Sequence, residues 1–422
     1  MTTQRPEDAP SHRFPRTGYH CEANYRTGDL DELPSYHHNP LIQALPPLLT
    51  QEQIETCTRA EPNLNRQQVC AYLLEKRVMA INEIGNLRIP VPAFTRFYHG
   101  LAGSMRKGYA PRNPLDPESR RQFLAAFKNL PDPDLNIQPV WPESTCCIGV
   151  FGDSGVGKTT LLERIINLFP QVIHHHQYNG QILELKQVVW LRLECPARGN
   201  VSALLNDFGL ELYWALKDEE NARKLLGKKN AWDTQRLWAI MRAHSQKLGV
   251  LVIDEVQRLK IIDDANKRRQ KNNEQAKQDR KLLYFLTSLA NTLNLPIIFC
   301  GTRAAQDVLN QEFGLCRRHS SPFNINLERL YPERGDWDLF LKALRPYQFT
   351  DQAAPLTGSL NKALFHESQG NIGLLMWLFT QAQYEALVSE SPQISPALIE
   401  KVARMFPTAI RGYIASLQAG FE

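Results

Sequence analysis

The stretch that decides the fold reads Cys146-Cys147-Ile148-Gly149-Val150-Phe151-Gly152-Asp153-Ser154-Gly155-Val156-Gly157-Lys158-Thr159-Thr160. An apolar run short enough for a buried strand ends at Phe151, and the pattern G-x-x-x-x-G-K-T then fills Gly152 to Thr159. A segment with helical periodicity opens at Thr160. A strand, a glycine-rich turn and a helix in this order are typical of a phosphate-binding P-loop (Walker A), so the sequence predicts a nucleotide-binding α/β domain.

The residues of this motif have complementary roles toward a nucleotide. The glycines let backbone N–H groups turn inward, and these groups form an anion nest with the N-terminus of the following helix. Lys158 places a cation on the β- and γ-phosphates, and the Thr159 hydroxyl can ligate Mg²⁺. A chance glycine-rich turn is the alternative, but strand, spacing, Lys-Thr and helix all agree. The predicted ATP-binding residues are Gly152, Asp153, Ser154, Gly155, Val156, Gly157, Lys158, Thr159 and Thr160.

Two carboxylates follow a second strand-like run, Val250 to Ile253. The apolar run predicts a buried strand, and Asp254 and Glu255 lie where it ends, which is a Walker B pattern. Asp254 would hold Mg²⁺ through water, and Glu255 would orient and polarise the water that attacks the γ-phosphate. The alternative is an ordinary helix N-cap after a strand. Beside a P-loop, the catalytic interpretation is favoured.

Three further residues join Lys158 and Glu255 in the predicted catalytic set. A third core strand over residues 296–300 leads into Thr302, whose side chain can sense the γ-phosphate or simply cap the next helix. Arg317 and Arg318 follow that helix. In a ring of subunits, one of this pair can act as an arginine finger on a neighbour's nucleotide, because guanidinium stabilises charge on the transferring phosphoryl group.

Composition sets broad limits on the protein. Its 422 residues allow two or three domains with cores, and 43% hydrophobic and 22% charged residues are ordinary for a soluble globular protein. Eight cysteines without a C-x-x-C pair favour reduced thiols in a cytosolic protein over disulfides or a zinc site. No apolar run approaches the roughly 18 residues of a membrane-spanning helix. The net charge of +5 permits nucleic-acid binding without requiring it.

The pattern of elements predicts three regions. Residues 1–140 carry most of the 27 prolines and form an N-terminal extension, with a poorly ordered polar arm and then a helical region for docking a partner or DNA. Residues 141–330 alternate strands and helices, with a hairpin signal at Asn179-Gly180. Residues 331–422 show only helical patterns and form a lid and a tail. The charged segment 258–281 is a solvated face, an insertion or a phosphate contact.

With a P-loop, a Walker B pair, Thr302, an arginine pair and a helical tail in this order, the chain resembles an AAA+ ATPase. More narrowly, it is similar to the TnsC/TniB family of transposition regulators. The passages that carry this similarity are Asn39–Pro46, Arg106–Pro114, Leu248–Gln257, Asn294–Thr302, Ser368–Gly370 and Leu417–Gly420. The resemblance implies a central parallel sheet flanked by helices, a small helical C-terminal lid and an N-terminal extension. One departure is that residues 370–374 contain no sensor arginine of the kind that many AAA+ lids carry.

The resemblance also implies a function. It implies an ATP-bound homo-oligomer, a ring or filament around duplex DNA in a prokaryotic cytoplasm, that links a TniQ/TnsD-type targeting protein to a TnsA/TnsB-type transposase. ATP hydrolysis to ADP and phosphate would drive disassembly, and the same type of regulator serves in elements guided by CRISPR effectors. The family's DNA contacts lie between Walker A and Walker B and would neutralise phosphates. By position, the candidates here are Arg198, Arg223, Lys224, Lys228 and Lys229.

Two other classes of ATPase stay open on the sequence. A STAND-type signalling ATPase would control protein partners without DNA, but it needs a long repeat or effector domain, and no internal repeat is visible. An AAA+ helicase loader would prefer single strands, and aromatic residues at the DNA face would favour it. The candidate basic positions show no such aromatic residues among them. A metabolic kinase is disfavoured because nothing indicates a small-molecule acceptor site.

Overall fold

The computed structural model describes residues 18–26, 33, 36–121, 147–221, 232–259, 274–311 and 322–419. The chain divides into two compact units, each assembled from several segments. The α/β unit comprises Met1–Gln51, Thr95–Phe151 and Leu162–Asn326. The helical unit comprises Glu52–Phe94, Gly152–Leu161 and Leu327–Glu422, so it includes the P-loop and part of the N-terminal region.

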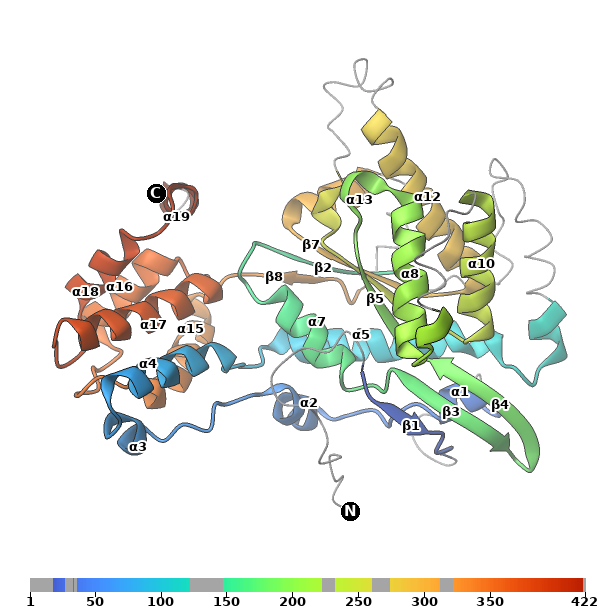
Figure 1. The fold of residues 1–422 in the computed structure, drawn as a ribbon, viewed down its shortest axis with the longest axis horizontal. Helices are drawn as coiled ribbons and strands as arrows, with labels where there is room; N and C mark the ends of the chain where they lie inside the picture. The colour runs from blue at the N-terminus through green and yellow to red at the C-terminus, as the bar shows by residue number, and fades with distance from the viewer. Residues whose placement is uncertain are drawn as a thin grey trace. The chain divides into compact units, whose positions relative to one another are not determined.

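The α/β unit is built on a five-stranded sheet (Figure 1), whose strands in spatial order are β5 (Trp190–Glu194), β6 (Val250–Asp254), β7 (Ile297–Gly301), β2 (Ile148–Gly152) and β8 (Ile325–Leu327). The β5–β6, β6–β7 and β7–β2 pairs are parallel. All residues of β2, β6 and β7 are buried, as expected for strands that are covered on both faces. The three strands predicted to end at Phe151, over Val250–Ile253 and over residues 296–300 are therefore confirmed, and the third begins one residue later, at Ile297.

Helices from the N-terminal region and from between the strands surround this sheet: α1 (Pro40–Gln43), α5 (Pro92–Tyr109), α7 (Lys158–Ile166), α8 (Val201–Ala215), α10 (Trp232–Ser245), α12 (Glu274–Leu293) and α13 (Arg303–Gln311). Helices α8, α10 and α12 pack on one another on one side of the sheet (Figure 1). The core between them and the sheet is apolar and includes Leu191, Leu251, Phe299, Leu205 and Leu286. Residues 274–281 of the charged segment belong to α12, and residues 260–273 lie outside the described residues.

A smaller sheet in the same unit joins β1 (His20–Glu22), β3 (Val172–Tyr178) and β4 (Gln181–Val188). Strands β3 and β4 form the predicted hairpin, and its turn residues Asn179 and Gly180 have φ angles of 48° and 78°, as a type I′ turn requires. Strand β1 pairs with β3 in parallel. The poorly ordered arm was expected to run from Met1 to about Glu32. That expectation is wrong for residues 20–22, because the edge of β3 offers them backbone hydrogen-bonding groups.

The helical unit contains α2 (Gln51–Thr58), α3 (Arg66–Cys70), α4 (Leu74–Glu83), α15 (Asp336–Leu344), α16 (Gly358–Ser368), α17 (Ile372–Val388), α18 (Pro396–Ala403) and α19 (Thr408–Ala419). Its core surrounds Trp337, Phe349 and Phe379, and Ile81 and Leu87 of the N-terminal region belong to the same core. In the described chain no strand follows β8. The parallel sheet of the α/β unit and the helical C-terminal region of this unit confirm the predicted fold class. Among the described residues, no helix combines the length and the apolar character needed to span a bilayer.

Candidate nucleotide-binding site

The P-loop runs from the end of β2 at Gly152 to the start of α7 at Lys158. Its backbone has positive φ angles at Gly155 (83°) and Gly157 (100°), in the left-handed region that favours glycine. The N-terminus of α7, which follows the loop, leaves N–H groups without partners inside the helix. The strand, turn and helix predicted for this stretch are therefore all present, and the loop has the features of an anion-binding nest.

The Lys158 side chain folds back over the loop. Its ammonium Nζ donates to the backbone carbonyls of Gly152 at 2.9 Å and of Asp153 at 2.8 Å. An ammonium has three donor positions, and these two carbonyls take two of them. Thr159, the predicted Mg²⁺ ligand, is exposed in the first turn of α7. Among the predicted ATP-binding residues, Gly152 and Val156 are buried and the others have solvent access.

Three hydrogen bonds join the P-loop to the C-terminal helices of the same unit. The donor and acceptor atoms are Asn371 Nδ2 to Ser154 O (2.8 Å), Gly373 N to Gly155 O (2.9 Å), and Tyr413 Oη to Asp153 Oδ2 (3.1 Å). Asn371 is also the N-cap of α17. A Cβ atom on Gly155 would lie 2.6 Å from the amide oxygen of Asn371, so this approach requires glycine. Burial and the neighbouring Asp153 carboxylate raise the pKa of the Tyr413 hydroxyl, which keeps it protonated as the donor.

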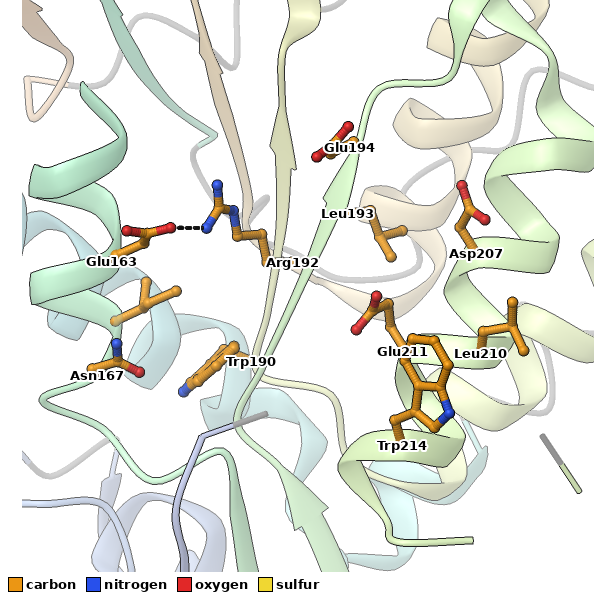
Figure 2. A pocket seen from close by; sticks show the side chains of 11 residues that line it. Glu163, Asn167, Trp190, Arg192, Leu193, Glu194, Asp207, Leu210, Glu211 and Trp214 are labelled. Carbon is orange, nitrogen blue, oxygen red and sulfur yellow. Dashed lines mark hydrogen bonds and ion pairs between the residues drawn. The ribbon is translucent and has the colours of Figure 1, made fainter. Parts of the chain in front are cut away.

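Asp254, the last residue of β6, is buried, and donors from the protein contact both of its carboxylate oxygens. Oδ1 accepts from the backbone N–H of Glu255 at 2.8 Å, and Oδ2 accepts from Nη2 of Arg192 at 2.7 Å. Arg192 lies on the neighbouring strand β5 and also pairs with Glu163 on α7 (Figure 2). One guanidinium therefore links the P-loop helix to the predicted Walker B carboxylate within the α/β unit.

The surroundings of Arg192 keep its guanidinium charged. Burial opposes the charge, but the hydrogen bonds and charges of Glu163 and Asp254 outweigh burial and raise the pKa of Arg192. The sequence analysis above assigns this residue no role. Its signal in the sequence is a single basic residue inside the apolar run from Val188 to Leu193, which indicates a buried partner without telling which one.

The residues present fit a magnesium ion that a nucleotide brings with it. A carboxylate has about four lone-pair positions, so Asp254 can accept from a metal-bound water in addition to its two protein donors. Within the described ranges, no group of three or more His, Cys, Asp or Glu side chains could hold a metal ion. Mg²⁺ is usually bound by one or two protein groups together with substrate phosphates and waters. As one such protein group, the Asp254 carboxylate matches this mode of binding, and the role of the Thr159 hydroxyl stays a prediction.

Glu255 and Thr302 are brought together by a residue that was not predicted, Gln257. The backbone of Glu255 is left-handed, with φ 58° and ψ 37°, and the short 3₁₀ turn η5 (Val256–Arg258) follows it. The Gln257 side chain donates through Nε2 to Glu255 Oε2. Its Oε1 accepts from the backbone N–H of Thr302 at 3.2 Å. Gln257 thus joins the end of β6 to the end of β7 through one amide.

A pocket of about 280 Å³ opens beside Arg192, between α7, the edge of β5 and α8 (Figure 2). Its polar lining is mainly acidic, because four carboxylates surround the one guanidinium: Glu163, Glu194, Asp207 and Glu211. Trp190 and Trp214 supply much of its apolar wall. Negative charge in the lining disfavours a phosphate ligand.

The remaining candidate residues are not placed by the structure. Arg198 lies in the 3₁₀ turn η4 (Ala197–Gly199), and its side chain is outside the description. The other DNA candidates and the arginine-finger pair fall in the ranges 222–231 and 312–321, outside the described residues: Arg223, Lys224, Lys228, Lys229, Arg317 and Arg318. Their roles stay predictions.

Comparison with known proteins identifies the domain type. Residues 143–309 match the family model described as an AAA domain. No curated protein matches the chain. Among solved structures, a Thermotoga maritima RuvB Holliday junction branch migration motor matches with 13% identity and a TM-score of 0.30, over 70% of this chain and 72% of that chain. With the parallel sheet and the helical C-terminal region, the AAA match establishes an AAA+ P-loop fold.

Proposed function

We propose that this chain binds ATP with Mg²⁺, hydrolyses it, and in its ATP-bound state oligomerises on duplex DNA as a regulator of transposition. The observation that carries the nucleotide part is the P-loop, with its two left-handed glycines and with Lys158 over its carbonyls, inside a matched AAA domain. The TnsC-like passages of the sequence support the DNA and transposition parts. In this proposal the assembly links a TniQ/TnsD-type targeting protein to a TnsA/TnsB-type transposase.

The proposed reaction uses the chain's own groups at the γ-phosphate. The P-loop amides and Lys158 bind the β- and γ-phosphates and compensate the charge that moves onto their oxygens. Glu255 accepts a hydrogen bond from the attacking water. The water oxygen bonds to the γ-phosphorus while the bond to the bridging oxygen breaks, which yields ADP and phosphate. The Thr159 hydroxyl and, through water, Asp254 would hold Mg²⁺, which would supply further charge compensation.

Two substitutions separate nucleotide binding from hydrolysis. Lys158→Ala should abolish binding of a fluorescent ATP analogue, because it removes the cation at the phosphates. Glu255→Gln should still bind ATP but turn it over roughly 100-fold more slowly or worse, since the water loses its polarising group. The matched control is Lys186→Ala, which changes an exposed lysine of β4 and should leave both measurements unchanged. Full turnover by Glu255→Gln would contradict the assigned role.

The DNA part is tested by duplex binding of purified protein with a non-hydrolysable ATP analogue, with ADP and without nucleotide, observed by electron microscopy and sedimentation. We expect ordered assemblies on duplex only with the analogue, and affinity that falls steeply with salt because phosphates are neutralised. Glu255→Gln should trap these assemblies in the presence of ATP. Absence of DNA binding in every state would favour a signalling ATPase, and preference for single strands would favour a helicase loader.

A further inference from the structure

We propose that Gln257 is a positioning residue that holds Glu255 for catalysis and connects it to the end of β7 at Thr302. This inference rests on the proposed ATPase function and adds to it a residue outside the Walker motifs. The three residues belong to the same unit and follow directly after two strands that are neighbours in the sheet, β6 and β7. Gln257 touches neither the P-loop nor any nucleotide in this proposal; it acts through Glu255.

The side-chain amide of Gln257 donates one hydrogen bond and accepts another. Its Nε2 donates to the Glu255 carboxylate, and its Oε1 accepts from the Thr302 backbone N–H at 3.2 Å. Glutamate at this position could still accept from Thr302, but it would place a second negative charge against Glu255. Methionine has nearly the same length and could make neither hydrogen bond. Only a side chain with both a donor and an acceptor satisfies the two neighbours.

Glycine at position 301 leaves room for the carbonyl end of this amide. A Cβ atom on Gly301 would lie 2.9 Å from Gln257 Oε1 and 2.8 Å from the Cβ atom of Ala305. Glycine at the end of β7 therefore lets the Gln257 carbonyl reach the Thr302 N–H. The requirement concerns space alone, because Gly301 does not have a positive φ angle.

Glu255 has a left-handed backbone conformation that its contacts can stabilise. A non-glycine residue in the left-handed region costs about 1 kcal/mol and persists where its surroundings hold it. The Glu255 N–H is bound by Asp254 Oδ1, and the Glu255 carboxylate by Gln257 Nε2. With Oε2 occupied by the amide, Oε1 is the oxygen left to face water. Gln257 thus selects the orientation of the carboxylate and ties that orientation to the position of Thr302.

The test compares ATP turnover and ATP binding in Gln257→Met, Gln257→Glu and the wild type. We expect kcat to fall between about 10- and 100-fold in both variants, the cost of a misplaced catalytic group, while the Kd for ATP changes less than twofold. Gln181→Met, an exposed glutamine of β4, is the matched control and should behave as the wild type. Thermal unfolding confirms that each variant is folded, and the use of one neutral and one charged substitution keeps one informative variant if the other unfolds.

A double-variant cycle separates positioning from a general structural role. If Gln257 acts through Glu255, then Gln257→Met should change kcat by less than twofold in a Glu255→Gln background, because the group that it positions is already gone. Equal losses in both backgrounds would overturn the inference, as would unchanged kcat in Gln257→Met alone. A wild type that binds DNA and nucleotide but hydrolyses no ATP would instead overturn the proposed function, and the inference with it.

Discussion

Replacing Arg192 by methionine tests the link between α7 and β6 most directly. The side chains of the three partners are largely buried, with exposed fractions of 27% for Arg192, 10% for Glu163 and 5% for Asp254. Removing one partner of a fully buried ion pair costs roughly 3–5 kcal/mol, because the other charges stay desolvated without compensation. The pocket beside Arg192 admits some water, which lowers this cost. We therefore expect Arg192→Met to reduce the free energy of unfolding by about 2–4 kcal/mol.

Urea unfolding followed by tryptophan fluorescence measures this loss, and Trp190 and Trp214 lie in the same pocket. Arg121→Met is the control, since Arg121 pairs with Glu118 at 3.7 Å on the exposed surface and its loss should cost less than about 1 kcal/mol. Adding Glu163→Gln to Arg192→Met should recover part of the loss, because one stranded carboxylate is removed. A loss below about 1 kcal/mol for Arg192→Met would show that the guanidinium does not hold these carboxylates and would refute the reasoning.

Three further substitutions test other parts of the fold and the site. Asn371→Leu should lower the free energy of unfolding by about 1–2 kcal/mol and weaken binding of an ATP analogue, since it loses a helix cap and the hydrogen bond to Ser154. The control is Ser395→Ala, which removes the cap of α18 and should lower the free energy of unfolding without changing binding of the analogue. Gly155→Ala should weaken analogue binding at least tenfold in a fluorescence titration, because φ is 83° there and the new Cβ meets Asn371; binding as in the wild type would contradict this account of the loop. Burial, and then neighbouring cations, lower the pKa of His244 to about 3, so this side chain stays neutral in the folded protein and takes up a proton only after unfolding. Its contribution to stability is therefore complete above the ordinary histidine pKa of about 6.5 and is lost as the pH falls. Urea unfolding should show a drop of about 1 kcal/mol between pH 6.5 and 5, a slope that His244→Gln should flatten.

Local sequence signals were sufficient for the nucleotide-binding elements. The strand before Gly152, the glycine spacing and the helix at Lys158 can be inferred from about fifteen consecutive residues, because each depends on near neighbours in the chain. The same holds for the hairpin at Asn179-Gly180, which the structure contains. Periodicity, caps and turn residues act over a few positions, so they are visible without the fold.

Two strands were not predicted because local sequence signals are too weak in short segments. Strands β1 (His20–Glu22) and β8 (Ile325–Leu327) have three residues each, too few for an apolar alternation to be recognised. Each forms because a longer strand presents an edge to it: β3 pairs with β1, and β2 is next to β8 in the sheet. Their existence is a property of the neighbouring strand rather than of their own residues.

The sequence by itself determined the class of fold and the residue types that can meet a nucleotide, since a P-loop and an aspartate–glutamate pair after a buried strand are contiguous patterns. Only the tertiary structure decided what those residues touch. Arg192 lies 62 positions from Asp254, Gln257 lies 45 from Thr302, and Asn371 lies 217 from Ser154. A polar residue in an apolar strand or at a helix start indicates that a partner exists, but strand order and helix packing choose the partner, because they set which distant segments become neighbours.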